Sequence, residues 1–287
     1  MTPQSFQRIA VVGLGLIGGS LVQSLRRALP ERKLLGVDFP HVLAQTRGFL
    51  DEQYTLADLP DAIANADLIF LATPIAAILE MLPLIAPAAK PGAIITDVGS
   101  TKQEIAVAAQ KFFSADKIFI GGHPRAGHEK GGWENAQPNL FLDAAYILTP
   151  SAHCPAEAVA ALQGLLQCLG ARVLLLDAEE HDRVAAEISH LPQLLAVALT
   201  NFIAREGVTS APRLQMAAGG FRDMTRIAAS PYHIWRDILR TNHANVRHAL
   251  HEFMSALHEI AHNLEDEKLE AAFQQARALR QELAGGK

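Results

Sequence analysis

The chain has 287 residues, and because a single hydrophobic core stops growing near this size, we expect two domains. Apolar residues make up 49% of the chain and charged residues 19%, a balance that excludes a disordered or fibrous protein. The net charge of -5, with no cluster of Lys and Arg, excludes the basic surface that nucleic-acid binding requires.

The sequence indicates neither a membrane protein nor a disulfide-rich one. No apolar run reaches the roughly 20 residues that cross a bilayer. Cys154 and Cys168 have neither CxxC spacing nor a pair of histidines at zinc-finger spacing, so we expect two buried free thiols and no metal. Residues 1–8 lack the basic and apolar segments of a secretory leader. We therefore expect a cytoplasmic protein.

Short apolar runs alternate with helical stretches in the first half of the chain. The runs show no alternation of apolar and polar residues, which is typical of strands buried on both faces of a parallel sheet. They cover residues 9–12, 33–37, 68–72, 93–98 and 118–121. Between them, stretches such as residues 18–29 and 75–86 are long enough to be crossover helices. The pattern predicts a doubly wound α/β domain.

Two further strand-like runs, residues 145–148 and 172–176, flank a helical stretch at 156–169 and are expected to extend the same sheet. After Asp177 the strand-like runs stop and helical periodicity takes over. We therefore expect two domains, residues 1–177 and an all-helical domain of residues 178–287.

The helical part contains two long amphipathic segments that are candidate subunit interfaces. One covers residues 179–203, where Pro192 is expected to kink the helix. In the other, apolar residues recur in steps of three and four and form one stripe: Val246, Leu250, Phe253, Leu257, Ile260 and Leu264.

A glycine-rich turn follows the first predicted strand and begins the first predicted helix. Gly13, Gly15 and Gly18 fit the pattern GxGxxG in that context, which is typical of the dinucleotide-binding Rossmann domain. Gly13 permits the tight turn, Gly15 lets the backbone approach a pyrophosphate, and Gly18 allows close packing of helix on strand. Leu16 and Ile17 lie at the helix N-terminus, where the pyrophosphate is expected.

Asp38 ends the next predicted strand, about 20 residues further on, where a carboxylate binds a ribose hydroxyl and repels the additional phosphate of NADP. Arg32 and Lys33 lie before Asp38, at the start of that strand, and so do not favour NADP. The competing interpretation is a glycine-rich turn without a ligand. The strand, the glycines and the acid in register favour a site for NAD.

Small or polar residues follow three of the predicted strands. Thr73 and Pro74 follow the third strand, Ser100 the fourth and His123 the fifth. Because ligands bind at the carboxyl ends of parallel strands, we expect these residues to line a crevice for cofactor and substrate. The glycines around His123 leave space beside its ring, which favours a functional imidazole.

Five segments, in order and spacing, resemble the prephenate/arogenate (cyclohexadienyl) dehydrogenase family. They are GLGLIGGS (13–20), DVGSTK (97–102), GGHPRAGHEKGG (121–132), SHLPQ (189–193) and GGFRDMTRIAASPYHIWRDI (219–238). The resemblance covers nearly the whole chain. It implies NAD-dependent oxidative decarboxylation of a cyclohexadiene in tyrosine biosynthesis, without a metal, by a homodimer that forms through the helical domain.

The resemblance also implies roles for individual residues. His123 corresponds to the histidine that takes the proton of the ring 4-hydroxyl, and Ser100 to its orienting hydrogen-bond partner. Arg226 corresponds to the guanidinium that clamps a substrate carboxylate, with the ring carboxylate the expected one.

The SHLPQ segment implies that Ser189, His190 and Gln193 bind the substrate. Many prephenate-specific members have histidine where this chain has Gln193, at the position expected to face the substrate side chain. An amide can donate or accept. The resemblance therefore leaves open whether the substrate is prephenate, arogenate or both.

Three other functions compete with this one. The segment from His258 to His262 matches HExxH, the zinc-protease motif, but both histidines fall outside the apolar stripe and few residues remain to supply a third ligand. An NAD-binding regulator would need the glycines and Asp38, but not His123, Ser100 and Arg226 together. A different two-domain hydroxyacid or imine dehydrogenase would not account for the GGHP and TRIA segments.

Overall fold

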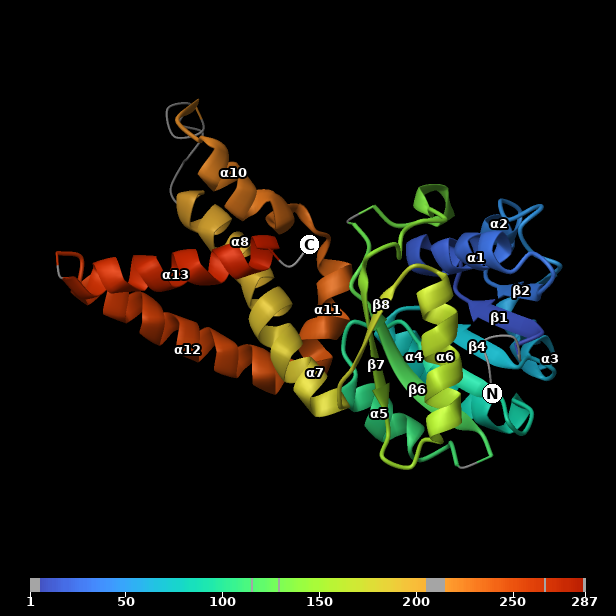
Figure 1. Ribbon diagram of the computed structural model, residues 1–287. Coiled ribbons are helices and arrows are strands. Elements are labelled where there is room, and N and C mark those ends of the chain that lie inside the picture. The colour runs from blue at the N-terminus through green and yellow to red at the C-terminus, as the bar shows by residue number, and fades with distance from the viewer. Residues whose placement is uncertain (1–5, 115, 129, 205–214, 266, 286–287) are drawn as a thin grey trace.

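The computed structural model describes residues 6–114, 116–128, 130–204, 215–265 and 267–285. Its N-terminal part is built on an eight-stranded sheet in the order β3-β2-β1-β4-β5-β6-β7-β8 (Figure 1). The strands are β1 (Arg8–Val12), β2 (Lys33–Val37), β3 (Glu52–Tyr54), β4 (Leu68–Leu71), β5 (Ile94–Asp97), β6 (Ile118–Pro124), β7 (Ala145–Pro150) and β8 (Arg172–Leu175). The doubly wound α/β prediction is confirmed, including the extension of the sheet by the last two strands.

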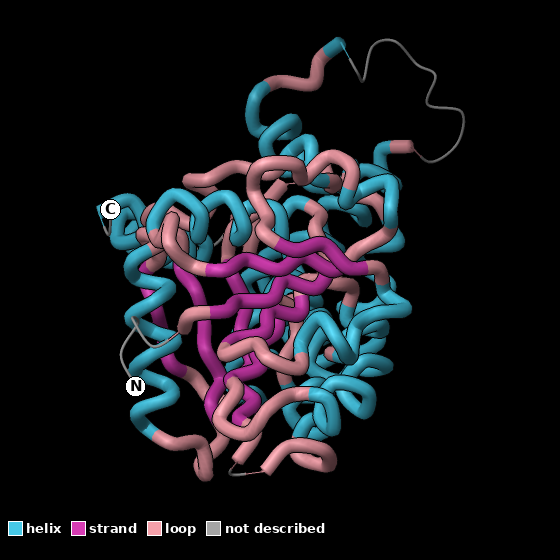
Figure 2. The backbone as a smooth tube through the Cα atoms, turned by 90° about the vertical axis from the view of Figure 1, so that its right-hand side faces the viewer, coloured by secondary structure: helices cyan, strands magenta, loops and turns pink. Residues whose placement is uncertain are grey.

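Helices cover both faces of this sheet (Figure 2). Ile9 and Val11 of β1 belong to a core shared with α1 (Leu16–Ala28) and α6 (Ala156–Cys168). Ala10 and Val12 point the other way, since successive side chains of a strand alternate between faces. That second core contains apolar residues of α3 (Leu59–Ile63), α4 (Ile75–Ala88) and α5 (Gln103–Ala109). The short helix α2 (Pro40–Leu43) follows β2.

β6 is longer than predicted and differs from the other strands in its pairing. It runs antiparallel to β7, whereas the other neighbouring strands are parallel. Pairing with β7 continues to Pro124, but pairing with β5 ends at Ile120. Beyond that point β6 is an edge strand on one side, where a proline without an N–H is tolerated. His123 was expected to follow this strand, but it lies inside it.

The C-terminal part is helical. β8 ends at Leu175, and Asp177 caps the next helix by accepting a hydrogen bond from the Glu180 backbone N–H (2.8 Å). The helices are α7 (Ala178–Ala185), α8 (Leu191–Ile203), α10 (Gly219–Thr225), α11 (Tyr232–Thr241), α12 (His243–His262) and α13 (Glu267–Gly285). Ile238 of α11 packs into the second core and joins this part to the sheet domain.

A π turn, Ala186–His190, separates α7 from α8 directly before Pro192. The Leu191 N–H bonds to the Ala186 carbonyl, five residues back. A π turn directly before Pro192, where we expected a kink, is a geometry that is frequent at functional sites.

Helices α12 and α13 form a hairpin that projects from the rest of the chain (Figure 1). Its exposed large apolar side chains are Met254, Leu257, Ile260, Leu264, Phe273, Leu279 and Leu283. Among the described residues, no helix has the length and apolar character needed to cross a membrane.

Candidate active site

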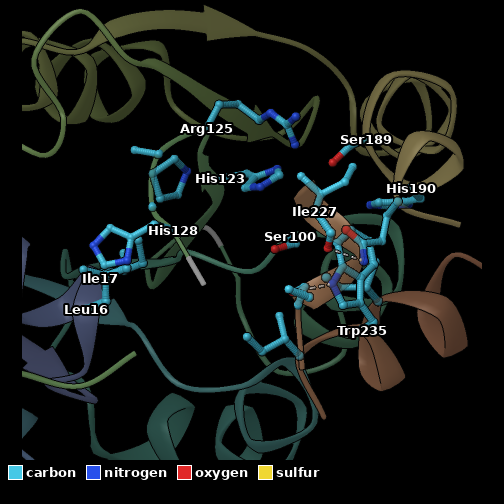
Figure 3. A pocket seen from close by; sticks show the side chains of 18 of the residues that line it. Leu16, Ile17, Ser100, His123, Arg125, His128, Ser189, His190, Ile227 and Trp235 are labelled. Carbon is cyan, nitrogen blue, oxygen red and sulfur yellow. Dashed lines mark hydrogen bonds between the residues drawn. The ribbon is translucent and has the colours of Figure 1, made fainter. Parts of the chain in front are cut away.

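A cavity of about 560 Å³ lies where the carboxyl ends of the strands meet the C-terminal helices (Figure 3). Eight of the predicted site residues line it: Leu16, Ile17, Ser100, His123, Ser189, His190, Gln193 and Arg226. Figure 3 shows Leu16 and Ile17 on one side and Ser189 and His190 on the opposite side, with His123 between them. The cavity thus connects the glycine-rich turn to the helical part.

The glycine-rich turn has the shape of a phosphate-binding turn. Gly13 has a φ of +89°, in the left-handed region, and a Cβ there would lie 2.6 Å from the Ala72 carbonyl oxygen. A Cβ on Gly18 would lie 1.8 Å from the Gly13 carbonyl oxygen. Gly15, the residue before α1, has open space where a Cβ would stand. Backbone N–H groups at the start of a helix are suited to bind an anion placed in such a space.

Two polar groups beside this turn can receive the rest of a dinucleotide. The Asp38 carboxylate accepts hydrogen bonds from the backbone N–H groups of Leu14 (2.5 Å) and Phe39 (2.6 Å), which leaves other lone pairs for hydroxyl donors. The Thr73 hydroxyl is buried without a protein partner, next to Gly13, and Pro74 precedes α4. A buried hydroxyl without a partner is unfavourable unless a ligand or water bonds to it.

His123 is buried, with 5% of its surface exposed. Burial, reinforced by nearby cations and imidazoles, lowers its pKa well below 6.5, so the ring is neutral at neutral pH. Its Nδ1 lies 2.8 Å from Nε2 of His181, whose Nδ1 lies 2.8 Å from Asp182 Oδ1. Ser100 lines the cavity, but no hydrogen bond joins it to His123 in the described structure. No pattern in the sequence indicates the pairing of His123 with His181.

The residues of the SHLPQ segment are held by neighbouring elements. Burial lowers the pKa of His190 to about 4, against the opposing effect of Asp182. The His190 Nδ1 lies 3.3 Å from the Asn242 amide nitrogen. Gln193 is buried and its amide nitrogen donates to the Ile227 carbonyl (3.0 Å), which ties α8 to the 3-10 turn that begins at Arg226.

Two guanidinium groups line the same cavity. Arg226 was predicted, whereas Arg125 was not singled out. Partial burial lowers the pKa of Arg125, but a guanidinium remains protonated at neutral pH. No carboxylate is found among the described residues that line the cavity. The cavity is therefore suited to a ligand with more than one negative charge.

A buried ion pair supports β6 next to His123. Lys102 pairs with Asp97, and its ammonium also donates to the Gly122 carbonyl (2.7 Å). The Gly122 N–H donates to Asp97 (3.1 Å). These contacts fix the backbone next to His123.

The two histidines of the HExxH segment, His258 and His262, are neighbours with ring centroids 4.1 Å apart. His258 and His262 are exposed on α12, and the described part of the chain contains no group of three or more potential metal ligands.

The comparisons with known proteins cover both parts of the chain. The family model "Prephenate dehydrogenase, nucleotide-binding domain" matches residues 21–175, and "Prephenate dehydrogenase, dimerization domain" matches residues 177–280. The chain is 38% identical over 283 residues to a prephenate dehydrogenase of Lactococcus lactis, covering 96% of this chain and 77% of that one. It is 35% identical over 254 residues to a cyclohexadienyl dehydrogenase of Zymomonas mobilis, covering 88% and 86%.

Two solved structures share the architecture over nearly their full length. An arogenate dehydrogenase of Synechocystis has a TM-score of 0.83 and 34% identity, covering 96% of this chain and 99% of that one. A prephenate dehydrogenase of Aquifex aeolicus in complex with hydroxyphenyl propionate and NAD+ has a TM-score of 0.89 and 30% identity, covering 97% and 99%.

Proposed function

The chain belongs to the prephenate dehydrogenase family, and we propose that it catalyses the NAD-dependent oxidative decarboxylation of prephenate, arogenate or both. The observation that carries this function is the position of His123. A buried, neutral imidazole lies in a cavity that reaches from a dinucleotide-type turn to two guanidinium groups.

Each part of the proposed reaction is assigned to particular residues. Bound NAD supplies the hydride acceptor. Neutral His123 takes the proton of the ring 4-hydroxyl as the carbonyl forms. Arg226 holds the ring carboxylate, which leaves as CO₂, and Arg125 binds the carboxylate of the side chain. Ser100 lines the same cavity, where its hydroxyl can bond to the substrate hydroxyl. Because the ring becomes aromatic, the reaction is irreversible.

The test of this function is kcat/KM measured side by side for prephenate and arogenate with NAD. We expect turnover of both substrates. Activity with neither would contradict the proposal, whereas strict specificity for one would remove only the dual-substrate part.

Gln193 is expected to set the ratio between the two substrates. Its amide nitrogen bonds to Ile227, so the carbonyl oxygen is the group left for the substrate side chain. Gln193→Glu places a negative charge that attracts the ammonium of arogenate and repels the more anionic prephenate. The ratio of kcat/KM should move toward arogenate by about tenfold or more, the effect of one charged hydrogen bond.

The control for this variant is Gln193→Met, which also loses the bond to Ile227 but introduces no charge. Equal ratios in the Glu and Met variants would show that Gln193 does not face the side chain of the substrate.

Asp38 is expected to select NAD over NADP. Asp38→Ala should weaken NAD binding by about 1.5–3 kcal/mol, since it removes a charged acceptor of the ribose hydroxyls, and should raise relative use of NADP. The variant also leaves the Leu14 N–H without its acceptor, so thermal stability is measured alongside. Equal use of both cofactors by the unchanged enzyme would contradict this role.

We also propose that the protein is a cytoplasmic homodimer. Cys154 and Cys168 are free thiols, as expected in a reducing compartment, but the expectation that both are buried is wrong, since Cys154 is partly buried and Cys168 is exposed. The exposed apolar side chains of α12 and α13 are suited to a subunit interface, because burying them would remove apolar surface from water.

The dimer is tested by sedimentation at micromolar concentration, which should show twice the 31.0 kDa mass of the chain. Leu257→Glu together with Ile260→Glu should shift the protein toward monomer. The matched control is Val107→Glu, which changes an equally exposed apolar residue on α5 and should leave the dimer intact. A monomer at all concentrations would rule the dimer out.

A further inference from the structure

A buried chain of hydrogen bonds runs behind His123, away from the cavity. His181 and Asp182 are 3% and 0% exposed, and neither lines the cavity. His181 bridges the other two side chains, with 2.8 Å from its Nε2 to His123 and 2.8 Å from its Nδ1 to Asp182. The two imidazole rings meet edge to face, with centroids 5.0 Å apart.

The direction of these hydrogen bonds follows from Asp182, the last group in the series. Asp182 accepts from the backbone N–H groups of Lys102 (2.7 Å) and Gln103 (2.9 Å), so its carboxylate is surrounded by donors. A carboxylate only accepts, and therefore His181 donates from Nδ1 and has its lone pair at Nε2. His123 must then donate from Nδ1. Its Nε2 is left with a lone pair, which is the form that a general base requires.

We propose that His181 and Asp182 are positioning residues, which hold His123 in the tautomer and orientation that accept the substrate proton. This assignment rests on the proposed function. The pair also links the two parts of the chain, because His181 and Asp182 lie on α7 whereas His123 lies on β6. The base is therefore oriented only while the helical part is docked on the sheet.

The other groups around the ring cannot perform this task. Arg125 and Lys102 are cations, which disfavour a protonated His123, and Lys102 is already paired with Asp97. His190 is held by Asn242 and has no hydrogen bond to His123. Asp182, acting through His181, is the carboxylate that stabilises the positive charge when His123 takes the proton.

The first experiment compares Asp182→Asn with the unchanged enzyme in the presence of NAD. An amide cannot satisfy all three donors that meet the Asp182 carboxylate, so the tautomer preference of His181 is lost. We expect kcat to fall by about 10²-fold, within the range for general-base catalysis, with NAD affinity unchanged. The acid limb of the kcat/KM profile should move to lower pH, because the charge that stabilises protonated His123 is gone.

A matched pair of variants at His181 separates hydrogen bonding from packing. His181→Phe keeps a ring but removes the acceptor, and kcat should fall as in Asp182→Asn. His181→Gln restores an acceptor near the same place and should recover part of the loss. Equal activity of the two variants would overturn the proposal.

Asp237→Asn is the structural control. Asp237 is another buried carboxylate on a helical segment, and it accepts from the Ala76 N–H at the start of α4 (3.2 Å), with no imidazole attached. The Asp237→Asn substitution should lower thermal stability while leaving turnover and the acid limb of the kcat/KM profile unchanged. If the loss of activity in Asp182→Asn tracked stability as in this control, without a shift of the acid limb, the role would be structural and the proposal wrong.

The tautomer of His123 can be measured by NMR without turnover of substrate. The chain has 12 histidines, and comparison of ¹⁵N spectra of unchanged and His123→Asn protein assigns the His123 nitrogens. We expect a protonated Nδ1 and an unprotonated Nε2. The opposite tautomer would overturn the proposal, and an enzyme inactive on both cyclohexadienes with the expected tautomer would instead contradict the proposed function.

Discussion

His123→Asn is expected to lower kcat by about 10²–10⁴-fold with prephenate and with arogenate, the range for loss of a general base. The dissociation constant for NAD should stay the same, because His123 lies apart from the glycine-rich turn. A loss in kcat with unchanged cofactor binding indicates a group that acts in the transition state. The matched control is His153→Asn, an exposed histidine outside the cavity, which should retain full activity.

The pH dependence of the unchanged enzyme follows from the burial of His123. Its neutral form is the active one, and burial holds its pKa well below 6.5. Activity should therefore be flat near neutral pH and fall only as pH drops through this lowered value. The free energy of unfolding should also fall at acidic pH. The contribution of the buried His123 ring is fully present above about pH 6.5, the ordinary pKa of the unfolded chain. It is lost as the pH falls below this value, because the unfolded state then binds the proton before the folded state does. An acid limb near or above pH 6.5 would contradict the assignment of His123 as a buried base.

The sequence predicted the parts of the site that depend on local pattern. Gly13 and Gly15 lie in the turn after β1 and Gly18 lies in the first turn of α1, and their spacing between a predicted strand and a predicted helix indicated this arrangement. Ser100 follows β5, and His123 lies near the end of the neighbouring strand β6. Because ligands bind at the carboxyl ends of parallel strands, the sequence already placed both residues at one edge of the sheet. The resemblance to a family supplied Arg226 and Gln193, which no periodicity indicates.

What the sequence missed depends on contacts between distant segments. The His181–His123 hydrogen bond joins residues 58 positions apart, and a His-Asp pair at a helix start has the pattern of an ordinary exposed turn. β3 has only three residues and a mixed pattern, too short for a period of two to be visible. The extension of β6 through Pro124 arises because β7 pairs with it and β5 does not, which only the sheet order reveals.

Arg226→Ala is expected to lower kcat/KM for both substrates by a similar factor, because the ring carboxylate is common to them. Loss of a charged hydrogen bond corresponds to about 1.5–3 kcal/mol, or roughly 10- to 150-fold. Arg226→Lys keeps the charge but loses the planar fork, and should recover only part of the loss. Arg240→Ala is the control, since its guanidinium forms a surface ion pair with Glu104 outside the cavity and should have little effect.

Binding of the aromatic product distinguishes the roles of Arg226 and Arg125, because the product has lost the ring carboxylate and keeps the carboxylate of the side chain. Arg226→Ala should therefore leave the product inhibition constant nearly unchanged, whereas Arg125→Ala should raise it along with the KM for substrate. We expect substrate binding to weaken in both variants and product binding to weaken only in Arg125→Ala. This result would assign one carboxylate to each arginine. If Arg226→Ala weakened the product as much as the substrate, Arg226 would bind the side chain instead, and the ring carboxylate would face Arg125.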